Sequence, residues 1–189
     1  MKINTLIIKV ALTFIPVFVM TGCTKYYSSA PVTYNTQSID KKIPVNVELT
    51  QKDWSIVIKL PDATVQKNVT DVLFDNPVFV EETNATKKMK IDILHHNDNG
   101  SVEIVGAMLT GASFYVIPSR TDSDVDITIS MDDITTKYTG EMGVVGGLVA
   151  SSLIDEKKYT KDNPMNLMKN LIKNAVGQFT ENYLKQHKL

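Results

Sequence analysis

The sequence KKMKIDILH, residues Lys87–His95, places an apolar side chain at every second position from Met89 to Ile93. Strict alternation of this kind predicts a β-strand that buries one of its faces. The sequence SDVDITISM, residues Ser123–Met131, shows the same alternation 36 residues later. We therefore expect two strands of one sheet, with their apolar side chains directed into a common core.

The 36-residue shift aligns apolar positions over a longer stretch, from residues 62–97 to residues 98–133. We interpret the alignment as a repeated structural unit of short helix, short strand, polar loop and long strand. In the second copy we expect a helix at Ser101–Thr110, begun by Ser101 as its cap. Gly106 and Gly111 leave a strand as the alternative for that segment.

Apolar periodicity predicts the remaining elements. Alternation indicates strands at residues 45–49, 54–60, 78–82 and 134–140. One helix is expected to begin at Pro61-Asp62 and to end at Asn76-Pro77, because the residue before a proline leaves the helical region. A second helix is expected from the cap Asn163 to about Gln186, with Pro164 in its first position. Its apolar stripe comprises Met168, Leu171, Ile172, Ala175, Val176, Phe179 and Tyr183.

These elements predict an α+β domain over residues 43–189. We expect a mixed or antiparallel sheet, with helices packed on one face and a long amphipathic C-terminal helix. The chain has 20 basic and 21 acidic residues among 189, which excludes the broad basic surface of a nucleic-acid-binding protein. Its single cysteine excludes an internal disulfide framework.

The N-terminus has the organisation of a secretory signal peptide. Lys2 and Lys9 precede the unbroken apolar run Val10–Met20, which is too short to span a bilayer as a stable helix. The sequence Met20-Thr21-Gly22-Cys23 follows and resembles the lipobox of bacterial lipoproteins, with Met20 where leucine is usual. The resemblance implies cleavage between Gly22 and Cys23 and diacylation of the Cys23 thiol.

By this resemblance, residues 1–22 are a lipoprotein signal peptide, and acyl chains on Cys23 anchor the mature protein in a membrane. Thr24 stands where aspartate would be expected in an inner-membrane lipoprotein. The resemblance therefore implies an outer-membrane protein whose domain faces the periplasm. Residues 23–42 lack an apolar period and are expected to be a tether. The tyrosines of that stretch are expected either at the lipid headgroups or as incidental linker residues.

The pattern of helix, short strand, alternating strand and C-terminal amphipathic helix over residues 87–189 resembles a recurrent periplasmic module. It is similar to small outer-membrane lipoproteins with the fold of the TolB N-terminal domain, such as the curli secretion lipoprotein. The resemblance rests on pattern, and it implies no binding residue.

The sequence offers no catalytic residue, cofactor site or metal site with a recognised spacing. His95 and His96 are adjacent, so on a strand they point to opposite faces and cannot chelate one metal together. Asp122, Asp124 and Asp126 are spaced like the start of a calcium loop, but Ile127 stands where that loop requires glycine. We interpret the three aspartates as the solvent-facing side of a strand.

The segment Met142–Ile154, MGVVGGLVASSLI, contains no charged residue. Small residues at this spacing permit close approach of two backbones. The segment is expected either to form an interface with a membrane, a second copy or another protein, or to pack inside the domain. The residues that we select as interface candidates are Gly143, Gly146, Gly147, Leu148 and Val149.

The expected function is non-catalytic and lies in envelope assembly, export or structural support. The expected partners are the membrane, other envelope proteins and a second copy of the chain, with no nucleic acid. One alternative is a carrier or chaperone that binds an amphiphile between the sheet and the helices, which requires an apolar pocket above roughly 300 Å³. A hydrolase of unfamiliar type is a further alternative, and it requires folding to bring histidines and carboxylates together.

Overall fold

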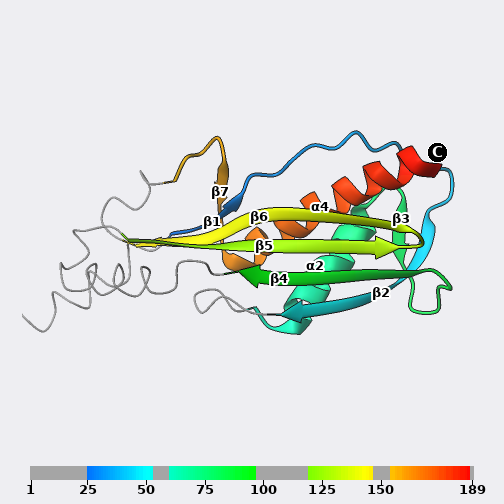
Figure 1. The fold of residues 1–189 in the computed structure, drawn as a ribbon, viewed down its shortest axis with the longest axis horizontal. Coiled ribbons are helices and arrows are strands. Elements are labelled where there is room, and N and C mark those ends of the chain that lie inside the picture. The colour runs from blue at the N-terminus through cyan, green and yellow to red at the C-terminus, as the bar shows by residue number, and fades with distance from the viewer. Residues whose placement is uncertain (1–24, 53–59, 97–118, 147–153, 188–189) are drawn as a thin grey trace, which may run out of the picture.

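The computed structural model describes residues 25–52, 60–96, 119–146 and 154–187 (Figure 1). The strands are β1 (Lys25–Ser29), β2 (Ile43–Lys52), β3 (Phe79–Glu81), β4 (Lys88–His96), β5 (Ser119–Met131), β6 (Ile134–Gly146) and β7 (Tyr159–Lys161). The helices are α2 (Asp62–Asp75) and α4 (Pro164–His187). In this part of the chain, no helix is both long and apolar enough to cross a membrane.

The strands form one sheet in the order β3-β2-β4-β5-β6-β1-β7. Strand β2 runs parallel to both β3 and β4, whereas the pairs from β4 through β5, β6 and β1 to β7 are antiparallel. Figure 1 shows α2 and α4 on the same side of this sheet. The structure therefore confirms the predicted α+β class, with a mixed sheet and helices on one face.

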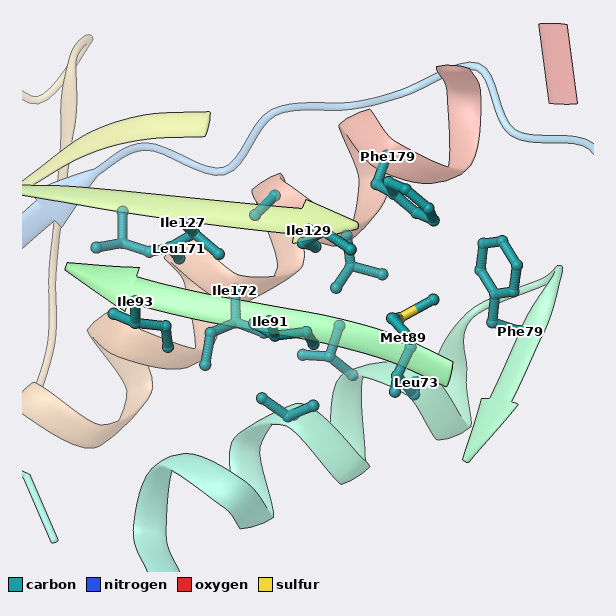
Figure 2. Close-up of a cluster of buried hydrophobic side chains, with 14 of the residues drawn as sticks. Leu73, Phe79, Met89, Ile91, Ile93, Ile127, Ile129, Leu171, Ile172 and Phe179 are labelled. Atoms are coloured by element: carbon teal, nitrogen blue, oxygen red, sulfur yellow. The ribbon is translucent and has the colours of Figure 1, made fainter. Parts of the chain in front are cut away.

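The main core lies between the helices and the sheet (Figure 2). Met89, Ile91 and Ile93 of β4 are buried there, and Ile127 and Ile129 of β5 lie opposite them. The alternation in the two sequences therefore predicted both strands and their buried faces. Helix α4 contributes the complete apolar stripe that its sequence predicted. Helix α2 contributes Val65, Val69, Val72 and Leu73.

Both helices begin where the sequence predicted. Asn163 caps α4, because its Oδ1 accepts a hydrogen bond from the backbone N–H of Asn166 at 3.0 Å. Helix α2 ends at Asp75, immediately before Asn76-Pro77. The Asn76 side chain then accepts hydrogen bonds from the N–H groups of Val78 and Phe79, so it directs the chain from the helix into β3.

The expected tether is the main difference from the sequence analysis. Residues 25–29 of that stretch form β1, which lies inside the sheet between β6 and β7. Tyr27 is fully buried, so it does not lie at the lipid headgroups as one of our interpretations had it. The sequence KYYSS has no alternation that would reveal a strand, and its partners lie far along the chain.

Several predictions concern residues that the structure does not describe. These are the signal peptide and Cys23, the strand at 54–60, the second-copy helix at Ser101–Thr110, and Gly147, Leu148 and Val149. The structure therefore describes both copies of the predicted repeat only at β4 and β5, which occupy matching positions in the two copies.

Candidate functional site

The face of the sheet opposite the helices carries a charged cluster centred on Asp126 of β5. Asp126 Oδ2 accepts hydrogen bonds from Lys137 Nζ at 2.8 Å and from His96 Nε2 at 2.9 Å. Asp126 Oδ1 accepts one from Thr139 Oγ1 at 2.6 Å. Burial by itself would raise the pKa of Asp126, but the hydrogen bonds from Lys137, Thr139 and His96 outweigh it and hold that pKa below its usual value.

The two adjacent histidines of β4 lie on opposite faces of the sheet. His96 contacts Asp126 on the open face, whereas His95 is 3 % exposed on the helix side of the sheet. Burial, followed by the neighbouring His96, lowers the pKa of His95 to about 4, so His95 is neutral at pH 7. Our prediction that the two imidazoles point to opposite faces is confirmed.

The Asp126 cluster is organised as an ion-pair network. His96 uses Nε2 to contact the carboxylate, and the nearby Ser123 hydroxyl donates to the His96 backbone carbonyl, not to the ring. A hydrolytic triad would instead leave one ring nitrogen directed at a hydroxyl nucleophile. Within the described ranges, no group of three or more histidine, cysteine or acidic side chains is placed to hold a metal ion.

A second polar cluster surrounds Arg120 of β5, where β5, β6, β1 and β7 meet. Arg120 Nε donates to Tyr27 Oη at 2.9 Å and to Asp122 Oδ2 at 2.8 Å. Its guanidinium carbon lies 5.1 Å from the Tyr27 ring centroid and 5.2 Å from that of Tyr159. Tyr159 Oη donates to Glu141. Cation–π contacts and charged hydrogen bonds together tie the edge strand β7 to the inner strands.

Two side chains of this cluster, Asp122 and Tyr159, have raised pKa values. Burial, reinforced by Glu141 and Asp124, raises the pKa of Asp122 to about 6. The hydrogen bond with Glu141, followed by burial, raises the pKa of Tyr159 above its usual value.

Asp122, Asp124 and Asp126 all lie on strand β5, as predicted. Asp126 is 8 % exposed, however, so a neighbouring strand covers part of the face that we expected to be wet.

Residues 30–42 form a strap that runs along α4 on its way from β1 to β2 (Figure 1). Asn174 of α4, which is 1 % exposed, fastens the strap: its Oδ1 accepts the Val32 N–H at 2.8 Å, and its Nδ2 donates to the Ala30 carbonyl at 3.1 Å. Tyr34 lies on Gly177, where a β-carbon would be 2.4 Å from the ring atom Cδ2. Glycine at position 177 therefore makes room for the strap.

A cavity of about 430 Å³ lies between the strap, the C-terminal end of α2 and the middle of α4. Val32, Val72 and Val176 supply apolar walls, and Lys169, Lys173 and Asp75 supply charge. Lys169 is paired with Asp71 at 2.9 Å. The cavity exceeds the volume that we set for an amphiphile carrier, although it lies outside the helices instead of between the helices and the sheet.

Two of the interface candidates lie in the sheet. Gly143 of β6 is buried, with Tyr27 of β1 opposite it on one side and Asp122 of β5 on the other. The hydrogen bond between Arg120 of β5 and Tyr27 of β1 therefore spans β6 beside Gly143. Gly146 is half-buried at the end of β6. An interface through the residues that continue this segment stays a prediction.

Sequence reasoning missed Arg120, Tyr27, Asn174 and the cavity. Each depends on contacts between segments that are distant in sequence, and none carries a motif. Compared with models of known protein families and with curated proteins, the chain matches none.

Proposed function

We propose that this chain is a lipid-anchored protein of the outer membrane that acts without catalysis, through contacts with other envelope proteins. The observation that carries the proposal is the sequence Met20–Cys23 at the end of a signal-peptide-like segment. Lys25, the first residue that the structure describes, already belongs to strand β1 and lies two residues after Cys23. The described polar clusters are consistent with a structural role, because their charged groups are paired with one another.

The outer side of β2 is our candidate for protein contacts. Strand β3 pairs only with residues 43–45 of β2. On that side, residues 46–52 have no strand partner in the part of the chain that the structure describes. Val47 and Leu49 of this stretch are partly buried and pack against the main core. An open strand side of this kind accepts an added strand from a partner through main-chain hydrogen bonds.

Crosslinking tests this contact surface. A photocrosslinking residue at Glu48, which is exposed on β2, should capture a second copy or another envelope protein in intact cells. The matched control is the same residue at Glu156, which is exposed near β7 and should capture neither. Equal capture at the two positions would contradict the assignment of the surface.

Fractionation tests the anchor. Cys23→Ser removes the thiol that would be acylated, so the protein should leave the membrane fraction. Thr24→Asp keeps the thiol, and the lipoprotein resemblance predicts that the protein then stays in the inner membrane. Thr24→Ser is the matched control and should fractionate like wild type. Unchanged membrane association of Cys23→Ser would overturn the proposal.

The cavity beneath the strap supports a second candidate function, the transport of an amphiphile. Its size and its combination of apolar walls with Lys173 favour a small molecule that has an apolar chain and an anionic head, with the head at Lys173 because Lys169 is already paired with Asp71. Val176→Trp should fill the cavity, whereas Val47→Trp on the distant sheet edge should not. A fluorescent fatty acid that binds wild type and the Val47 variant equally, but not the Val176 variant, would favour the carrier. Failure to bind wild type would exclude it.

A further inference from the structure

The distance along the chain between the proposed anchor and the sheet is very short. Lys25, the first residue that the structure describes, already pairs with Val145 in the sheet, so two residue steps separate the sheet from Cys23. Two steps span at most about 7 Å even when the chain is fully extended. A flexible tether of some 20 residues, as the sequence suggested, would instead give a root-mean-square span of roughly 25 Å.

Strand β1 is firmly held in the sheet. It pairs with β6 over Lys25–Ser28 and with β7 over Tyr27–Ser29. Tyr27 is fully buried and its hydroxyl accepts the hydrogen bond from Arg120. The Ser29 hydroxyl accepts a further hydrogen bond from the Glu141 N–H at 2.8 Å. The start of β1 therefore cannot move away from the domain unless these contacts break.

The strand register shows at which end of the sheet Lys25 lies. Lys25 lies opposite Val145 of β6, and Val145 lies opposite Arg120 of β5. We call this the Lys25 end. The other end of the same two strands is the turn at Asp132-Asp133 (Figure 1). The 11 residue steps of β5 from Arg120 to Met131 separate the two ends by about 37 Å.

We infer that the Lys25 end of the sheet lies against the lipid headgroups and that the Asp132-Asp133 turn points away from the membrane. This inference rests on the proposed acylation of Cys23 and deepens it, because it gives the domain a fixed orientation. The partner is the bilayer surface itself. Helix α4 follows the same direction, with its first turn toward the Lys25 end and its C-terminus beside the far turn (Figure 1).

The orientation can be tested on the full-length acylated protein. Cys23 is the only cysteine, and acylation consumes its thiol, so one introduced cysteine can be labelled alone. Met165→Cys places a fluorophore on the first turn of α4, where the side chain is 44 % exposed. Asp133→Cys places it on the exposed far turn. Each protein is reconstituted in phosphatidylethanolamine–phosphatidylglycerol vesicles that contain a lipid with a quencher on its headgroup.

We expect quenching several-fold stronger at position 165 than at position 133. The matched control inserts 20 glycine and serine residues between Thr24 and Lys25, which keeps the lipobox and the fold and should abolish most of the difference. Equal quenching at the two positions without the insertion, with an acylated Cys23 confirmed by mass, would overturn the orientation alone. A mass that shows an unmodified Cys23 would overturn the anchor and the orientation together.

Discussion

Asn174→Ala should destabilise the domain strongly, because one buried side chain joins the strap, α4 and the sheet. Its Oδ1 accepts the Val32 N–H, and its Nδ2 donates to the Ala30 carbonyl and to Tyr138 Oη on β6, the last at 3.0 Å. The Asn174 side chain is 1 % exposed, and the three hydrogen bonds that it makes are partly buried. At about 1 kcal/mol for each hydrogen bond, the loss in the free energy of unfolding is roughly 3 kcal/mol.

Urea denaturation of the chain Thr24–Leu189, which lacks the proposed anchor, measures this loss. For a chain of this size, about 3 kcal/mol corresponds to a melting temperature lower by roughly 6–12 °C. The matched control is Asn170→Ala, one turn earlier on α4. The Asn170 side chain makes no hydrogen bond within the described ranges, so the control should cost less than about 0.5 kcal/mol.

A double-mutant cycle sharpens the test. Tyr138→Phe removes one of the three bonds, so it should destabilise wild type more than it destabilises the Asn174→Ala protein. Equal losses of stability in Asn174→Ala and Asn170→Ala would refute the reasoning, because they would show that the strap is not fastened by this side chain.

Three further predictions concern separate features. Gly177→Ala should destabilise wild type, because the Tyr34 ring occupies the space that the new methyl group needs. In a Tyr34→Ala background the same substitution should stabilise α4 by about 1 kcal/mol. Thermal unfolding of both pairs of proteins tests whether the effect of the substitution changes sign. The pKa of His95 near 4 lies below its unfolded value of about 6.5, so its contribution to stability is complete above pH 6.5 and falls as the pH drops toward 4. Urea titrations across this range should show a shallower fall for His95→Gln, and parallel curves would contradict it. If the uncharged segment Met142–Ile154 is an interface, Gly146→Glu should reduce self-association of Thr24–Leu189, measured by sedimentation. If that segment packs inside the domain, the substitution should lower the melting temperature and leave self-association unchanged.

The elements that the sequence predicted are those with a local signal. Strands β4 and β5 alternate without interruption, and α4 has a cap, an initial proline and a continuous apolar stripe. Their buried faces follow from the same periodicity, because side-chain direction repeats every two residues in a strand and every 3.6 in a helix.

The features that escaped prediction depend on strand order and register. KYYSS has no alternation, so only its pairing with β6 and β7 reveals β1. Asp126 appears on the solvent-facing side of its own strand, but Lys137 and Thr139 of the neighbouring strand cover it. In the sequence, Asn174 is only a polar residue within the apolar side of α4. Its role is apparent only from its hydrogen bonds to Ala30 and Val32 of the strap.

Intact-mass and peptide mass spectrometry of the mature N-terminus, from protein purified out of membranes, tests the lipid anchor most directly. We predict cleavage between Gly22 and Cys23 and a diacylglycerol thioether on Cys23, with or without a third acyl chain on the new amino group. A protein that retains residues 1–22, or one whose Cys23 carries a free thiol, would contradict the anchor and with it the orientation on the bilayer.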